Sequence, residues 1–199
     1  MINKIIVASN NQKKIKEIKA ILEPLNIEVL SLKDMNIDVD PEETGSSFIE
    51  NAFIKAEEIF KIVNLPVIAD DSGLEVDALN GAPGIYSARY AGEPKDDEKN
   101  LEKLLENLKD KEDKTARYVC AIALIVDKNN KYAVEEYLDG KIIDQRKGEH
   151  GFGYDPIFYL PEYKKTTAEL DPDFKNQISH RAKALHKIEQ MIKEINDAD

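Results

Sequence analysis

The chain has 199 residues, enough for one sizeable domain or for two lobes around a cleft, and its hydrophobic share of 42% and charged share of 34% are those of a soluble globular protein. Asp and Glu number 39 against 28 Lys and Arg, so the net charge of −11 argues against binding of polymeric nucleic acid unless basic residues gather in one place. No apolar run reaches about 18 residues, which predicts no membrane-spanning helix, and a short apolar start favours a strand over a signal peptide. The cytoplasm is the expected location.

The single cysteine, Cys120, lies in an apolar run and is expected to be a small buried hydrophobic residue. Because the three histidines show no zinc-ligand spacing and form no cluster with cysteine, a transition-metal site is not expected.

The first part of the chain alternates short apolar runs with amphipathic segments. Residues 5–8, 28–32 and 66–69 read as strands, whereas 13–23 and a segment that carries Ala52 and runs to about Val63 have helical periodicity. Ser47 and Glu50 have the spacing of a capping box in front of the second helix. This βαβαβ order predicts an α/β fold with helices packed on a sheet.

The second part changes character. We expect a helix at 96–108, strands at 115–127 and 131–138 joined at Asn129-Asn130, a further hairpin turn at Asp139-Gly140, and a closing helix at 179–196. An antiparallel meander would then extend or flank the first sheet.

The loop between the first strand and the first helix is one candidate for binding. Its residues are Ser9, Asn10, Asn11, Gln12, Lys13 and Lys14. Hydroxyl and amide side chains beside backbone N–H groups at a helix N-terminus make an anion site, to which two lysines add charge. Ordinary helix capping with solvated lysines explains the same residues equally well.

Acidic side chains supply a second candidate. Asp70-Asp71 ends an apolar strand, and adjacent carboxylates repel each other unless a cation lies nearby. Mg²⁺, held by one or two carboxylates and substrate phosphates, would provide it; a plain turn at Asp-Asp-Ser-Gly is the alternative. Glu42 and Glu43 either complement the following helix dipole or supply a second metal ligand.

Two further segments are candidates for nucleotide contact. In Gly151-Phe152-Gly153-Tyr154-Asp155-Pro156 the glycines allow close backbone approach and the aromatic rings offer a stacking face, although a turn with core aromatics would look alike. Lys175, His180 and Arg181 lie just before or at the start of the last helix. Because an arginine there opposes the helix dipole, a ligand or a carboxylate should compensate it.

Taken together and in this order, these motifs resemble the inosine/xanthosine triphosphate pyrophosphatase family (dITP/XTP pyrophosphatases) from Ile5 to about Leu185. The specific pieces are residues 43–45 with 48–52, 69–74, 81–90, 151–156 and 178–181. The first loop departs from the family's Thr-Gly-Asn-x-x-Lys, although Ser9 keeps the hydroxyl and Lys14 the final lysine.

The resemblance implies one α/β domain over residues 1–199, with two lobes around a long central mixed sheet flanked by helices and an active-site cleft between the lobes. It also implies a Mg²⁺-dependent homodimer that removes dITP, ITP and XTP from the nucleotide pool. Asp71 would be the proton acceptor and a metal ligand, together with Glu42 or Glu43. The implied substrate contacts are Ser9 to Lys14, Ser72, Phe152, Gly153, Tyr154, Asp155, Lys175, His180 and Arg181.

The hypothesis that follows is that Asp71 and Mg²⁺ activate a water molecule that attacks the α-phosphorus and expels pyrophosphate. A donor on His180 or Arg181 would select the 6-oxo group of hypoxanthine or xanthine over the 6-amino group of adenine. Two alternatives remain at this point: a pyrophosphatase for modified pyrimidine nucleotides, and a nucleotide-sensing protein without turnover.

Overall fold

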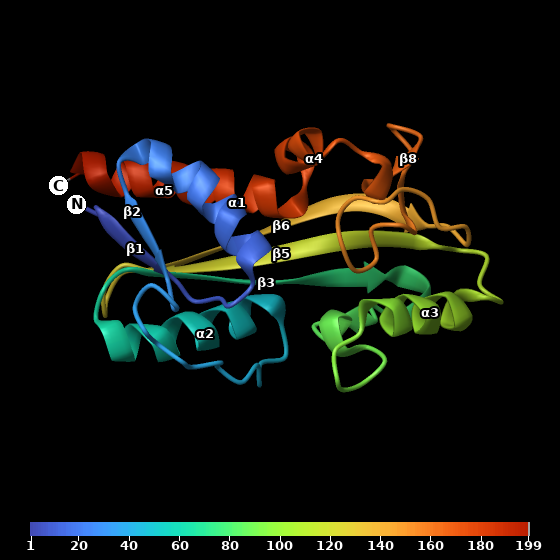
Figure 1. Ribbon diagram of the computed structural model, residues 1–199, viewed down its shortest axis with the longest axis horizontal. Helices are drawn as coiled ribbons and strands as arrows, with labels where there is room; N and C mark the ends of the chain where they lie inside the picture. Colours follow the sequence, from blue (N-terminus) through green and yellow to red (C-terminus); the bar gives the residue numbers. More distant parts are fainter. Residues whose placement is uncertain (199) are drawn as a thin grey trace. The chain divides into compact units, whose positions relative to one another are not determined.

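The computed structural model describes residues 1–198 and contains a mixed β-sheet flanked by helices (Figure 1). The strands are β1 (Lys4–Val7), β2 (Glu28–Ser31), β3 (Val67–Val76), β4 (Pro83–Gly84), β5 (Thr115–Ile125), β6 (Lys131–Ile142), β7 (Phe158–Leu160) and β8 (Lys165–Thr166). The helices of more than one turn are α1 (Gln12–Leu22), α2 (Phe48–Val63), α3 (Asp97–Leu108), α4 (Pro172–Ile178) and α5 (His180–Ala198).

The strand order is β2-β1-β3-β5-β6-β7-β8, and β4 pairs with β3. β1 runs parallel to both β2 and β3, whereas the pairs β3–β4, β6–β7 and β7–β8 are antiparallel. The α/β class and the mixed sheet expected from the sequence are therefore confirmed. In the described part of the chain, no helix combines the length and the apolar character needed to cross a membrane.

The chain divides into two compact units. Unit 1 comprises residues 1–71, residues 120–136 and the C-terminal segment from residue 181, and unit 2 comprises residues 72–119 and 137–180.

Unit 1 has a hydrophobic core on each face of its part of the sheet. Helices α1 and α5 cover one face and α2 covers the other (Figure 1). Successive strand residues alternate between the two cores: Ile68 packs with α1 and α5, whereas Val67 and Ala69 pack with α2. Cys120 packs in the first of these cores as a free buried thiol, and burial raises its pKa to about 12, so it serves as the small hydrophobic residue expected.

Local signals set the ends of α2. The Ser47 hydroxyl accepts a hydrogen bond from the backbone N–H of Glu50 at 3.1 Å, as expected of an N-cap. The reciprocal half of the predicted capping box is shifted by one residue, because the Glu50 carboxylate accepts the backbone N–H of Ser46 at 2.7 Å instead. At the other end Asn64 takes the left-handed conformation, with φ of 48°.

The hairpin turn expected at Asp139-Gly140 is wrong, because β6 continues through both residues to Ile142. A Cβ on Gly140 would lie 2.7 Å from the Tyr159 carbonyl oxygen and 2.8 Å from the Phe158 ring. The glycine therefore serves the close approach of β7 and does not mark a turn.

Unit 2 has one core, built from α3 and from the strand segments that belong to this unit. Leu101, Leu104 and Leu108 of α3 are buried there with Leu74 of β3 and Phe158 of β7. This core supports the segment 151–156 that the sequence singled out.

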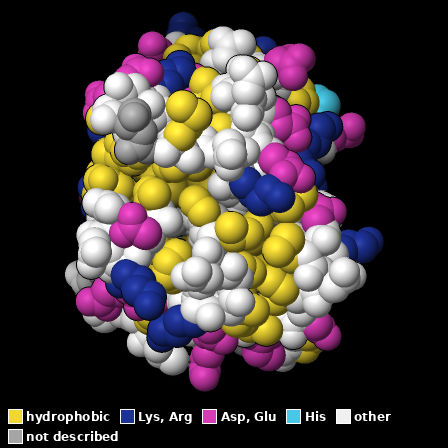
Figure 2. All heavy atoms as spheres, turned by 90° about the vertical axis from the view of Figure 1, so that its left-hand side faces the viewer, with side chains coloured by type: hydrophobic (Ala, Val, Ile, Leu, Met, Phe, Trp, Pro, Cys, Tyr) yellow, Lys and Arg dark blue, Asp and Glu magenta, His cyan; other side chains and the backbone are white. Residues whose placement is uncertain are grey.

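Figure 2 views the molecule from the side on which both chain ends lie in Figure 1. On that face hydrophobic side chains form a band, and Lys and Arg side chains occur in small groups among Asp and Glu. On this face the basic side chains therefore form no continuous patch.

Candidate active site

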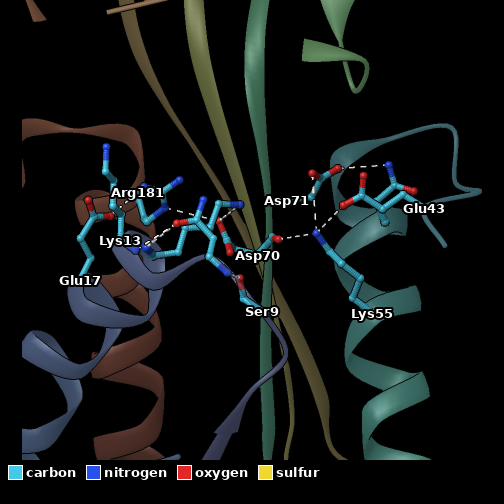
Figure 3. A network of polar contacts seen from close by, with 11 residues as sticks. Ser9, Lys13, Glu17, Glu43, Lys55, Asp70, Asp71 and Arg181 are labelled. Atoms are coloured by element: carbon cyan, nitrogen blue, oxygen red, sulfur yellow. Dashed lines mark hydrogen bonds and ion pairs between the residues drawn. The ribbon is translucent and has the colours of Figure 1, made fainter. Parts of the chain in front are cut away.

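Asp70 and Asp71 lie in β3 and their side chains point to opposite faces of the sheet (Figure 3). The alternation of strand side chains requires this, because Asp70 falls on the face of Ile68 and Asp71 on the face of Ala69. The two carboxylates therefore have different neighbours.

Asp70 lies among cations from α1 and α5. Its Oδ2 is 2.9 Å from Lys14 Nζ and 3.4 Å from Arg181 Nε, and Arg181 donates a second bond of 2.7 Å from its NH1 group to Glu17. Burial alone would raise the pKa of Asp70, which is 3% exposed, but Lys14 and Arg181 outweigh it and hold the pKa well below its usual value. The carboxylates of Asp70 and Glu17 are thus the compensation that an arginine in the first turn of α5 was expected to need.

Asp71 faces α2 and the segment before it. Its Oδ2 accepts a 3.1 Å hydrogen bond from Asn51 Nδ2, and its Oδ1 is 3.9 Å from Lys55 Nζ. Lys55 also donates bonds of 2.7 Å to Glu43 Oε1 and of 2.7 Å to the carbonyl oxygen of Asp70. Burial raises the pKa of Asp71 to about 6, with Glu43 adding to the shift and Lys55 opposing it.

The structure places the two candidate glutamates differently. Glu43 is half-buried and bonded to Lys55, and its charge acts on Asp71, whereas Glu42 is exposed. Of the two, Glu43 is therefore the neighbour of Asp71.

The contacts of Asn51 and Lys55 with Asp71 were not predicted from the sequence. These two side chains lie four residues apart on α2 and so share one face of the helix, where Asn51 is fully buried. A buried polar residue on the core face of a helix was the available signal.

The first loop caps its own helix. The Asn11 side chain accepts the backbone N–H groups of Lys13 and Lys14, at 3.0 and 3.3 Å, and the Ser9 hydroxyl accepts the N–H of Asn11 at 3.1 Å. These bonds match the capping interpretation, and they engage the backbone N–H groups of Asn11, Lys13 and Lys14. The lysine charge remains: Lys13 is exposed with Asn10 and Gln12, while Lys14 is directed at Asp70.

In unit 2 the segment 151–156 is organised around Asp155. The Asp155 carboxylate is 3% exposed and accepts four hydrogen bonds. Oδ1 accepts the hydroxyls of Tyr118 and Thr167, at 3.1 and 2.8 Å, and Oδ2 accepts Lys175 Nζ at 2.6 Å and the Phe152 N–H at 2.9 Å. Asp155 therefore fixes this segment, and its acceptor positions are filled from within unit 2.

The two aromatic residues of this segment differ. Tyr154 is buried and its hydroxyl donates to the Ser87 carbonyl at 2.8 Å, whereas the Phe152 ring is 39% exposed. Phe152 is therefore the ring that offers a stacking face, and Lys175 Nζ lies 5.7 Å from its centroid. His180 is buried in the same unit, and Ser72 is half-buried in β3.

Comparison with known proteins identifies the family. The Ham1 family profile matches residues 5–191. The chain belongs to the Ham1 family. It is 52% identical to the dITP/XTP pyrophosphatase of Clostridium perfringens, over 96% of this chain and 98% of the relative, and 51% identical to that of Bacillus subtilis, over 94% and 96%. The Staphylococcus aureus Ham1 protein has a solved structure that aligns with a TM-score of 0.90 at 48% identity, over 96% of this chain and 98% of that one.

Proposed function

We propose that this Ham1 family protein hydrolyses non-standard purine nucleoside triphosphates, dITP and ITP with XTP and dXTP, to the monophosphate and pyrophosphate. The observation that carries the proposal is the buried Asp71 carboxylate, whose pKa is raised to about 6 beside Lys55 and Glu43. Relatives about half identical to the chain bear the name dITP/XTP pyrophosphatase, which supports the choice of substrate.

In the proposed reaction, Asp71 accepts a proton from the attacking water. The water oxygen forms a bond to the α-phosphorus, the bond from the α-phosphorus to its bridging oxygen breaks, and pyrophosphate leaves with that electron pair. In the metal-free protein burial raises the pKa of Asp71 to about 6, so this carboxylate is largely ionised at neutral pH and can accept a proton. Asn51 and Lys55 would hold the carboxylate in place.

The donor set suits Mg²⁺. Glu43 and Asp71 both lie beside Lys55, and the charge of Glu43 acts on Asp71, so these two carboxylates are the oxygen ligands that this part of unit 1 could offer. Mg²⁺ is commonly bound by one or two carboxylates, with substrate phosphates and water completing its shell. When bound, it would neutralise phosphate charge and lower the pKa of a water ligand. Glu43, which lies beside Asp71, would fill this role in place of the exposed Glu42.

Substrate contacts are assigned by chemistry. The lysines of the first loop, of which Lys14 is held by Asp70, supply positive charge for the phosphates. Phe152 would stack on the base, and donors on Lys175 and His180 would meet the 6-oxo acceptor of hypoxanthine or xanthine. ATP presents a 6-amino donor there and would leave a buried donor unpaired, at a penalty of about 1–3 kcal/mol. Because the Arg181 guanidinium contacts two carboxylates, we give His180 the larger part in base choice.

A pyrophosphate-release assay tests the function. The substrates are ITP, XTP, ATP, GTP and dUTP, each with Mg²⁺ and again with a chelator. We expect ITP and XTP to be preferred by kcat/KM and the chelator to abolish turnover. A preference for dUTP would favour a pyrimidine pyrophosphatase, and tight ITP binding without turnover would favour a sensor.

The variant Asp71→Asn tests the mechanism. We expect kcat to fall by about 10²–10⁴ while the variant remains folded. The matched control is Asp144→Asn, which removes a carboxylate that is 74% exposed and should leave kcat unchanged. Near-normal turnover by folded Asp71→Asn protein would overturn the assignment.

We further propose a homodimer in solution, which light scattering would test.

A further inference from the structure

Tyr118 of β5 lies inside unit 2 between two aromatic side chains. Its ring centroid is 4.8 Å from that of His180 with an interplanar angle of 13°, and 4.3 Å from that of Phe158 with an angle of 39°. Tyr118 and His180 are each 8% exposed. The near-parallel stack sets the plane of the imidazole against a residue of strand β5, and a strand is a more rigid support than a loop.

The Tyr118 hydroxyl has a second contact. It donates to Asp155 Oδ1 at 3.1 Å, and the other oxygen of that carboxylate holds Lys175 and the Phe152 N–H. Burial, with Asp155 adding to it, raises the pKa of Tyr118 well above its usual value, so the phenol stays protonated and keeps its donor. The Tyr118 side chain thus contacts His180 directly, and it is linked to Lys175 through the Asp155 carboxylate.

We propose that Tyr118 is a positioning residue for recognition of the nucleobase: its ring sets the plane of His180 and its hydroxyl fixes the carboxylate that holds Lys175. The inference rests on the proposed function, in which His180 and Lys175 meet the base. A donor selects between 6-oxo and 6-amino groups only when its direction is fixed, because a ring free to tilt loses little by meeting the wrong group.

An ordinary core residue would behave differently. Its loss lowers the stability of unit 2 and affects every substrate alike. Loss of a positioning residue changes KM and the choice between bases, while kcat for ITP is kept because the proton transfer at Asp71 is untouched. The split between KM and kcat therefore separates the two roles.

The first test compares Tyr118→Leu with Leu104→Ala in the intact protein. Leu104 is fully buried in the same core and serves as the matched control for lost packing. We expect Tyr118→Leu to raise KM for ITP about two- to tenfold, which corresponds to the interaction energy of one aromatic pair. The same variant should lower the ratio of kcat/KM for ITP to kcat/KM for ATP. Leu104→Ala should lower stability and leave that ratio unchanged. Identical ratios in the two variants would overturn the proposal.

Double-mutant cycles complete the test. In a His180→Ala background, Tyr118→Leu should add little to KM because both changes remove the same contact; effects that multiply would overturn the proposal. The conservative Tyr118→Phe keeps the stack and loses only the hydroxyl. It should raise KM about threefold in the native background and less in Lys175→Met, so this cycle decides the matter if the leucine variant fails to fold.

Wild-type protein in the same assay separates a failure of the proposed function from a failure of the positioning role of Tyr118. If it turned over neither ITP nor XTP, the proposed function would be rejected and the role of Tyr118 in base choice would fall with it. If wild-type protein preferred ITP and the Tyr118 variants kept that preference, the function would stand and the positioning role alone would be rejected.

Discussion

The buried ion pairs of Asp70 make a sharp prediction about stability. Asp70→Asn keeps the shape of the side chain but removes the charge that faces Lys14 and Arg181. Breaking a buried pair by removal of one partner costs about 3–5 kcal/mol. The Lys14 side chain is 15% exposed and Arg181 retains Glu17, so we expect a loss near 3 kcal/mol at pH 7.

The pH dependence follows from the direction of the pKa shift. Because the pKa of Asp70 is lowered in the folded protein, its contribution is complete above its ordinary pKa of 3.8 and is lost as the pH falls through the folded value. The difference between wild type and Asp70→Asn should be constant from pH 7 to about pH 5 and shrink below pH 4.

Urea denaturation followed by circular dichroism measures this difference, and hydrogen exchange of peptides from unit 1 localises it. Asp144→Asn, whose carboxylate is 74% exposed, is the control and should change stability by less than about 0.5 kcal/mol. A loss for Asp70→Asn no larger than that of the control, or one that persists undiminished at pH 2, would refute the argument.

Two further predictions concern the site itself. Lys55→Met removes the cation beside Asp71, so the pKa of Asp71 should rise further. As a result kcat at pH 7 should fall at least about tenfold, and the acid limb of the pH–rate profile should move to higher pH. An acid limb that does not move would contradict this prediction. Gly151→Ala would place a Cβ 2.0 Å from Asp155 Oδ2 at a φ of +81°, whereas Gly81→Ala, with a φ of +86°, meets nothing within 4 Å. KM for ITP should therefore rise in the first variant, while the second loses only about 1–2 kcal/mol of stability; equal KM values would contradict this.

Periodicity predicted the elements of unit 1 to within a few residues, because α1 and α2 each bury one apolar stripe on a sheet. Periodicity did not predict the end of β3, because contacts with residues distant in the sequence determine it. The strand expected to end at Ala69 continues as β3 through Asp70 and Asp71, because cations from other elements face both carboxylates. A window of local sequence contains neither Lys14 nor Lys55, so it treats the acidic pair as the end of a strand.

The same contacts explain why the sequence did not predict that the two carboxylates have separate cations. As neighbours in a turn, the two carboxylates would repel each other and share one cation. In an extended strand they face opposite sides, and each receives its own environment: lysine and arginine lower the pKa of Asp70, whereas burial and Glu43 raise that of Asp71. Divergent pKa values in neighbouring carboxylates mark a division of roles. Asp70 holds Lys14 and Arg181, whereas Asp71, with its raised pKa, is the carboxylate to which the proposed function gives the proton transfer.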